Sequence, residues 1–313
     1  MRYIEDLKSG ETIVCHYLCK KKESLKTKSG KNYLSLVLAD RTGEILGRVW
    51  TLNKDIQSFE SGDFIKIDAT VDSYLDELQL NIRKIRKSGE GEYLPADYIP
   101  TTEKDVNEIY RAVCAYVASM QNEHLKKLLN AIFVQNDEVK AAFLSRSAAR
   151  SMHHSYMGGL CEHTLNVAQI CDFLAPRYKF VNRDLLVTAA LLHDIGKIYE
   201  LSEFPENDYT DCGRLLGHIT MGVNLVTAEI AKIQGFPANL QNLLLHCLLS
   251  HHGKLEFGSP ILPKTIEAFI LSQADETDAH IKMFEEHLTK APPTADWTGF
   301  NRKFGREIRR SNL

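Results

Sequence analysis

The residues of this sequence best suited to chemistry are histidines and aspartates in its second half. Ten of the 12 histidines follow residue 150, and several stand beside a carboxylate or a glycine where a helical pattern ends. Imidazoles and carboxylates bind divalent cations, and none of the candidates is a thiol. The candidates are His163 in CEHT, His193 and Asp194 in LLHDIGK, His218 in LLGHI, His251 and His252 in LSHHGK, and Asp275 in SQADETDA.

The adjacent pair His193 and Asp194 indicates how many cations to expect. Neighbouring residues diverge by about 100° on a helix, so from a mid-helix position the two side chains cannot reach one metal ion in the same way. Gly196 ends the helical pattern directly after them, and a carboxylate can bridge two cations about 3.5 to 4 Å apart. Asp275 follows the apolar segment AFILSQA, where an unpaired carboxylate is costly to bury. We therefore predict a dinuclear site, and the sequence leaves open whether one or both histidines of the HH pair ligate.

Helices must position these ligands. From Thr102, which with Asp105 resembles a capping box, to about residue 288, apolar residues recur at helical spacing. The ligand-bearing segments would point into one bundle interior, as in metal-binding helical bundles. The predicted helices are 103–120, 123–134, 137–148, 161–175, 182–195, 214–233, 238–251 and 264–289.

The first 88 residues have a different pattern, with short β-rich segments of two-residue period separated by turn signals. Leu34, Leu36 and Leu38 would share one sheet face. Five strands with a helical connection between the third and fourth are typical of an oligonucleotide-binding (OB) barrel. The predicted strands are Thr12–Cys19, Asn32–Ala39, Ile45–Trp50, Phe64–Val71 and Leu78–Ile85, with Leu52–Phe59 as a possible short helix.

Aromatic and basic side chains of these strands favour a single-stranded nucleic acid as partner. Rings stack on bases and cations follow phosphates, although any one strand aromatic is more often a core residue. Two local runs of positive charge, Lys20 to Lys31 and Arg302 to Arg310, are equally well explained as solvated loops. The candidate contacts are Tyr17, Tyr33, Trp50 and Tyr74 for bases, and Arg48, Lys66 and Arg83 for phosphates.

Length and composition set the class of protein. A chain of 313 residues exceeds one ordinary domain, and 44% hydrophobic with 25% charged residues excludes a disordered or collagenous chain. Apolar stretches such as Leu185 to Leu192 are too short to span a membrane, and the start MRYIEDLKSG lacks a signal-peptide core. Seven scattered cysteines without a CxxC pair indicate reduced thiols. We expect a cytoplasmic protein with no membrane partner.

The order His163, then His193-Asp194, then Asp275 resembles the H…HD…D signature of the HD-domain metal-dependent phosphohydrolases. His218 and the HH pair are similar to the extra histidines of members that hold two metals. After the HH pair this chain reads GKLEFGSP, without the GYP element of the cyclic dinucleotide phosphodiesterase branch, so that branch is disfavoured.

With the OB-like front half, the segments HHSYMGGLCEHT, LLHDIGK, GRLLGHI and LSHHGKLEFGSP resemble the YhaM-type exoribonucleases over nearly the whole chain. The resemblance implies 3′-to-5′ removal of nucleoside monophosphates from single-stranded RNA, to some degree also from single-stranded DNA, with a divalent cation such as manganese, by a homo-oligomer. We predict a multidomain α+β protein with an OB-fold domain at 1–88, a linker and connecting helix at 89–122, and an HD-type domain with a basic tail at 123–313.

Roles for further residues follow from their chemistry. Mixed imidazole and carboxylate ligands suit Mn²⁺, Fe²⁺, Co²⁺, Ni²⁺ or Zn²⁺ better than Mg²⁺, and we expect two Mn²⁺ ions. A bridging water would attack the terminal phosphodiester. Lys197 is a candidate phosphate contact or a helix-terminal charge. His153 and His154 are candidate phosphate contacts or proton donors, and Glu162 would orient His163 or activate water.

The remaining histidines, and the remaining functions, have simpler interpretations. A histidine on an apolar helix face is usually a core or boundary residue, and we expect this of His246, while His16, His124, His280 and His287 are expected to be surface or packing residues. The sequence also leaves open a nucleotidase that acts on mononucleotides, or an RNA-binding protein whose metal site is inert.

Overall fold

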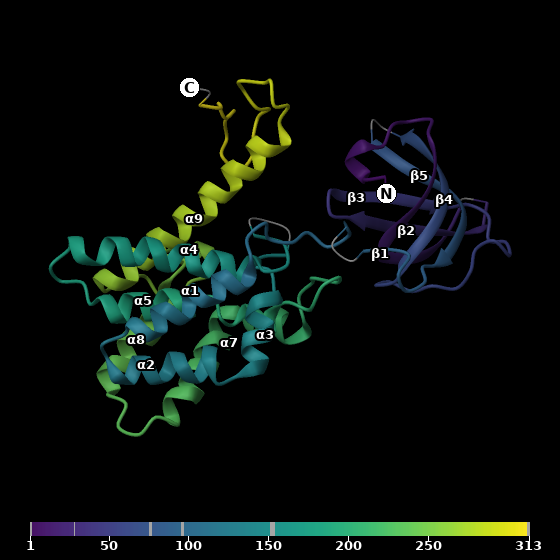
Figure 1. The fold of residues 1–313 in the computed structure, drawn as a ribbon. Helices are drawn as coiled ribbons and strands as arrows, with labels where there is room; N and C mark the ends of the chain where they lie inside the picture. The colour runs from purple at the N-terminus through teal and green to yellow at the C-terminus, as the bar shows by residue number, and fades with distance from the viewer. Residues whose placement is uncertain (1, 28, 75–76, 95–96, 151–153, 312–313) are drawn as a thin grey trace. The chain divides into compact units, whose positions relative to one another are not determined.

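The structure is a computed structural model that describes residues 2–27, 29–74, 77–94, 97–150 and 154–311 (Figure 1). The chain forms two compact units, one made mainly by residues 1–101 and the other mainly by residues 102–313. The first is a β-barrel and the second is helical, which confirms the predicted α+β fold class.

The first unit is a closed barrel with the strand order β1-β2-β3-β5-β4 (Figure 1). Neighbouring strands are antiparallel except β3 and β5, which are parallel and pair Gly47 with Leu80. Antiparallel ladders closed by one parallel pair give the small Greek-key barrel that the strand count predicts. The strands are β1 (Thr12–Lys26), β2 (Asn32–Asp40), β3 (Gly43–Val49), β4 (Phe64–Tyr74) and β5 (Glu77–Lys87).

Alternation of side chains builds the barrel core. Along β4, Ile65 and Ile67 point inward with at most 1% of their surface exposed, while the residues between them face outward. Leu34, Leu36 and Leu38 of β2 are all buried, so the predicted shared face is confirmed.

Two local predictions in this unit are wrong. Residues 52–59 form no helix; instead Ile56 bridges Ile85 of β5 and the backbone N–H of Gln57 donates to the Ile85 carbonyl at 2.9 Å. The basic run from Lys20 is not a loop, because β1 continues to Lys26 and pairs with β2 up to Asn32. In both places hydrogen bonds to a neighbouring strand outweigh the local sequence preference.

The helical unit starts at Thr102 and packs its helices around α4 and α5. Polar side chains cap several helices, for example Asn182 at α5 and Thr210 at α7. The helices are α1 (Val106–Ser119), α2 (Glu123–Leu129), a π-helical turn η3 (Asn130–Val134), α3 (Asp137–Ser145), α4 (Gly159–Leu174), α5 (Arg183–Leu192), α6 (Lys197–Glu200), α7 (Asp211–Ala231), α8 (Ala238–Ser250) and α9 (Ile266–Lys290).

Helix α5 is the centre of this unit. Every residue from Leu185 to Leu192 is buried, which explains why the segment is apolar all round. Helix α1 contributes Ile109, Val113 and Val117 to the same core, so it belongs to the helical unit and is not a connecting helix. Among the described residues, no helix has the length and apolar character needed to cross a bilayer.

The start of α1 differs from the predicted capping box. Asp105 is the N-cap and accepts a hydrogen bond from the N–H of Asn107, whereas the Thr102 hydroxyl donates to Glu162 at 2.5 Å. The other end of the unit is a hairpin of residues 297–310, the C-terminal hairpin, where Trp297 bridges Arg309 and Asn301 bridges Arg306. The basic run at the C-terminus is therefore part of a folded hairpin, in which most of its side chains are exposed.

Candidate metal centre and nucleic-acid surface

The predicted metal ligands converge inside the helical unit. His163 comes from α4, His193 and Asp194 directly follow α5, and Asp275 lies on α9. His218 lies in α7, while His251 and His252 directly follow α8. His163, His193, Asp194 and His251 each expose at most 2% of their surface. Five distant segments of the chain thus meet at one buried place.

Two glycines allow this convergence. A Cβ on Gly196 would lie 2.0 Å from the His218 carbonyl oxygen, so only glycine lets the turn after α5 approach α7 this closely. Gly217 has a φ of 71° and interrupts the helical geometry of α7 one residue before His218. The kink therefore sets the direction of that imidazole.

The ligand atoms form two groups that meet at Asp194. One group contains His163, His193 and Asp275, and the other contains Asp194, His218, His251 and His252; within each group the ligand atoms lie within 4.8 Å of one another.

The carboxylate of Asp194 faces both groups. Its Oδ2 lies 3.5 Å from His163 Nε2 and 3.4 Å from His193 Nε2. Its Oδ1 lies 3.5 Å from His218 Nε2 and 3.6 Å from His251 Nε2. This is the placement that a carboxylate shared by two cations requires.

Hydrogen bonds on the far side of the rings fix which nitrogen faces the site. His193 Nδ1 lies 2.8 Å from the Ala190 carbonyl, and His251 Nδ1 lies 2.7 Å from the Leu248 carbonyl. A carbonyl can only accept, so Nδ1 carries the proton and Nε2 offers its lone pair to the site. The same arrangement holds for His252 with the Phe257 carbonyl at 2.7 Å, His163 with Asp278 at 2.6 Å and His218 with Glu200 at 3.1 Å.

Several ligand atoms have no hydrogen-bond partner within the described part of the chain. They are Asp194 Oδ1, His218 Nε2 and His251 Nε2, all buried. Buried polar atoms without partners are unfavourable in a folded protein. Imidazole nitrogens and carboxylate oxygens that face one another in this way fit divalent transition metals.

The electrostatics of the cluster favour positive charge. Burial by itself lowers the pKa of His163, but hydrogen bonds to Asp275 and Asp278 outweigh burial and raise that pKa to about 10. Burial by itself raises the pKa of Asp194, yet Lys197 and His193 hold it well below its usual range. Because the site stabilises protonated imidazole beside ionised carboxylate, a cation can take the place of those protons.

Asp278, which the sequence reasoning missed, orients His163. Its Oδ2 accepts hydrogen bonds from His163 Nδ1 at 2.6 Å and His154 Nε2 at 3.0 Å, and its Oδ1 accepts one from Asn166 at 2.9 Å. The signal was present, because Asp275 and Asp278 are three residues apart and so share one face of α9.

The contacts of Glu162 do not support the prediction that it orients His163 or activates water. Glu162 accepts hydrogen bonds from Thr102 and Tyr156 instead, and it is not among the described residues that line the ligand pocket. His154 is fully buried between Tyr156 and Asp278, so the prediction that it contacts phosphate is wrong. His153 lies outside the described residues.

Lys197 takes a position between the ligands and the solvent. Its ammonium donates to Asp194 Oδ2 at 2.6 Å, and this contact helps to raise the pKa of Lys197 despite the opposing effect of burial. The same side chain lines the pocket above the ligands. It can therefore neutralise both a ligand carboxylate and an anion that enters the pocket.

A pocket of about 570 Å³ opens onto the ligands. Its lining includes the candidate ligands Asp275, His218 and His252 and the exposed aromatic rings of Tyr209 and Phe257. Lys303 of the C-terminal hairpin and His280, which the sequence predicts to be a surface or packing residue, also line it. The pocket therefore combines metal ligands, aromatic rings and cations in one space.

On the barrel, three of the predicted contacts form one cluster. The rings of Tyr33 and Trp50 stack with centroids 4.8 Å apart, and Arg48 lies 5.8 Å from the centre of Tyr33. Trp50 is 47% exposed, so a base can reach it. Tyr17 is different: its side chain is fully buried in the core, and the prediction that it stacks on bases is wrong.

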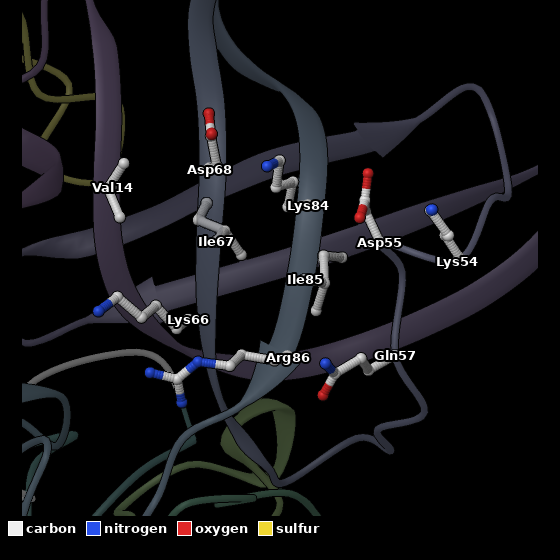
Figure 2. A pocket seen from close by; sticks show the side chains of 10 residues that line it. All are labelled: Val14, Lys54, Asp55, Gln57, Lys66, Ile67, Asp68, Lys84, Ile85 and Arg86. Carbon is white, nitrogen blue, oxygen red and sulfur yellow. The ribbon is translucent and has the colours of Figure 1, made fainter.

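The remaining barrel candidates lie apart from this cluster. Lys66 is on β4, which does not neighbour β3, and Figure 2 shows it in a pocket with Arg86 and Lys84. Arg83 is held by Asp68 at 2.6 Å, and Tyr74 is 65% exposed at the end of β4. The structure therefore does not bring all the predicted contacts together.

The sequence of this chain matches a known domain family and several curated proteins. Residues 160–280 match the HD domain family. The 3′-5′ exoribonuclease YhaM of Geobacillus sp. (strain WCH70) is 31% identical over 286 residues, 91% of this chain and 87% of that protein. The YhaM proteins of Bacillus velezensis and Listeria innocua are each 32% identical, over 91% and 92% of this chain and 90% and 91% of their own lengths.

Two solved OB-fold structures match a part of this chain. The second OB-fold domain of replication protein A from Methanococcus maripaludis covers 29% of this chain and 95% of its own, with a TM-score of 0.23 and 22% identity. An OB domain from Methanosarcina mazei covers 33% and 94%, with a TM-score of 0.25 and 20% identity. Because the sequence match to the exoribonucleases extends over 91% of its length, the chain belongs to the YhaM family of 3′-5′ exoribonucleases.

Proposed function

We propose that this protein removes nucleoside 5′-monophosphates from the 3′ end of single-stranded RNA at a site built for two divalent cations. The observation that carries the proposal is the placement of Asp194, whose two oxygens face two separate groups of imidazole Nε2 atoms. Membership of an exoribonuclease family supplies the reaction class.

The donor set supports a separate group of ligands for each cation. His163, His193, Asp194 and Asp275 would hold one ion, while Asp194, His218, His251 and His252 would hold the other. Two manganese ions suit these mixed nitrogen and oxygen donors. Bound ions of this kind supply Lewis acidity at the phosphate and a water that loses its proton near neutral pH.

The protein's own residues bind and orient the strand. Lys197 is placed to stabilise negative charge on the scissile phosphate, because it lies beside Asp194 and lines the pocket. Tyr209 and Phe257 offer faces to the terminal base. On the barrel, Tyr33, Trp50 and Arg48 supply a stacking platform and a cation for the upstream strand. A platform of this kind requires unpaired bases.

A labelled oligonucleotide tests the proposal. Single-stranded RNA labelled at its 5′ end should give a ladder that shortens from the 3′ end and requires added Mn²⁺. Asp194→Ala should abolish the ladder and reduce bound metal, whereas RNA binding by the barrel persists. Asp172→Ala is the matched control, because Asp172 pairs with Arg183 away from the ligands. A full ladder from the Asp194→Ala protein would refute the assignment.

The same assay separates the alternatives. Turnover of mononucleotides without a ladder would indicate a nucleotidase, and binding without either reaction would indicate an inert metal site. A DNA oligonucleotide of the same sequence measures the tolerance for deoxyribose. We also propose a homo-oligomer, which sedimentation of the metal-loaded protein checks.

A further inference from the structure

The C-terminal hairpin is a defined element. The Thr298 N–H donates to the Ile308 carbonyl at 2.8 Å, and both of these residues are buried. At the tip, the side chain of Asn301 accepts from the backbone N–H groups of Lys303 and Phe304 at 2.9 and 3.2 Å. These bonds fix the conformation of the turn that carries Lys303.

The hairpin is anchored to α9, the helix that carries Asp275. The ring of Phe304 packs on Phe284 with centroids 4.4 Å apart and on His280 at 5.7 Å. His287 Nε2 lies 3.0 Å from the Gly299 carbonyl. The position of the hairpin tip is therefore set by the same helix that supplies a metal ligand.

Lys303 consequently reaches the pocket above the metal ligands, where it is one of the lining residues together with Lys197 and Arg150. Lys197 donates to Asp194 at 2.6 Å and so belongs to the ligand cluster, whereas Lys303 comes from the hairpin. Burial lowers the pKa of Lys303, although Glu286 opposes this effect.

The groups that can bind phosphate therefore come from two different parts of the pocket. The cations held by the two ligand groups, together with Lys197, would bind the scissile phosphate. Two carboxylates, Glu200 and Glu276, also line the pocket, and Glu200 accepts a hydrogen bond from His218. A further cation at the pocket wall is useful to a substrate with a second phosphate, and an RNA strand has one where a nucleoside monophosphate has none.

We propose that the C-terminal hairpin presents Lys303 to a phosphate of the RNA strand next to the scissile one, so that this tail positions polynucleotide substrates. The inference rests on the proposed exoribonuclease function. It makes Lys303 a positioning residue for the strand and gives the basic tail a specific task. It also explains how a phosphohydrolase pocket can favour a strand over a mononucleotide.

Steady-state kinetics of Lys303→Met test the inference with two substrates, a 5′-labelled RNA oligonucleotide and bis(p-nitrophenyl) phosphate. Loss of one charged phosphate contact should raise KM for RNA about tenfold and leave kcat within about twofold. The salt dependence of log KM should fall by about one phosphate equivalent. Turnover of the small diester should be unchanged, because it has no second phosphate.

Two further kinds of variant complete the test. Lys179→Met removes the same charge from an exposed site outside the pocket and should leave KM unchanged. Phe304→Ala removes the anchor on Phe284 and should reproduce the Lys303→Met phenotype, while Lys303→Arg should restore most of the RNA affinity.

The outcomes separate this inference from the proposed function. Wild-type protein that does not shorten RNA at all refutes the function. RNA shortening by the wild type with an unchanged KM and salt dependence in Lys303→Met refutes only the role of the hairpin. An equal loss of activity on both substrates would also refute it, because it would place Lys303 at the scissile phosphate.

Discussion

Replacing Asp278 with asparagine tests whether the carboxylate behind His163 sets the affinity of the metal site. Asp278 accepts three hydrogen bonds, from His163, His154 and Asn166, at 2.6, 3.0 and 2.9 Å. An amide has nearly the same shape but no charge and only one acceptor oxygen. The single amide oxygen of the Asp278→Asn variant could therefore accept either from His163 and His154 or from Asn166, but not from both sides. The hydrogen bond to His163 would also no longer involve a charged carboxylate.

The size of the effect follows from that bond. Removing the charge from a carboxylate that orients a metal-binding imidazole typically weakens metal binding by 10- to 100-fold, or about 1.4 to 2.7 kcal/mol. The bond to His163 is the shortest of the three, so we expect the upper half of that range for the ion held by His163, His193 and Asp275. A second ion bound by His218 and His251, as proposed above, should lose less affinity.

Calorimetric titration of the metal-free protein with Mn²⁺ measures both affinities directly. The Asp278→Asn protein should show one weakened site and one nearly normal site, and its RNA cleavage should recover at high Mn²⁺. Asp172→Asn, in a surface ion pair, is the control and should bind metal normally. Equal affinities in wild type and Asp278→Asn, with both proteins folded by circular dichroism, would refute the orienting role of Asp278.

Four further outcomes are expected. Chelation of the metal should lower Tm, because it leaves Asp194 Oδ1 and His251 Nε2 buried without partners, and calorimetry checks this. The metal-free protein should lose stability as the pH falls below about 4, because the folded state holds the pKa values of Asp194, Asp275 and Asp278 below their values in the unfolded chain. A Tm that rises as the pH is lowered through this range would contradict this. Trp50→Ala should weaken RNA binding by about 1 to 3 kcal/mol in a fluorescence titration, and unchanged binding would exclude the platform. Leu186→Ala should destabilise the helical unit by about 2 to 5 kcal/mol in urea unfolding, because the side chain is fully buried.

The sequence was sufficient for most of the elements and for the candidate ligands, because both depend on local patterns. Apolar periodicity identified helix after helix, and the unusual combination of histidine and aspartate, in part at helix ends, identified the candidate ligands of the site. The structure places both His251 and His252 in the ligand group, a question that the spacing left open.

Roles that depend on tertiary contacts were not predictable in the same way. Whether His154 contacts solvent or Asp278 depends on where α9 passes, and the role of His280 depends on a hairpin that folds back more than 20 residues later. Tyr17 is an exception, because it has the same two-residue phase as the buried residues Ile13 and Cys19, and this phase already indicated the core.

The carbonyl groups that hold His193 and His251 belong to the last turns of α5 and α8, three residues before each histidine. Two helix C-termini therefore end at the metal centre, and their macrodipoles add negative potential there. This field attracts cations and repels phosphate, so we expect an ordered sequence in which RNA enters the pocket productively only after metal has been loaded. Without metal, the enzyme would then fail to bind RNA productively in the pocket, as well as fail to cleave it.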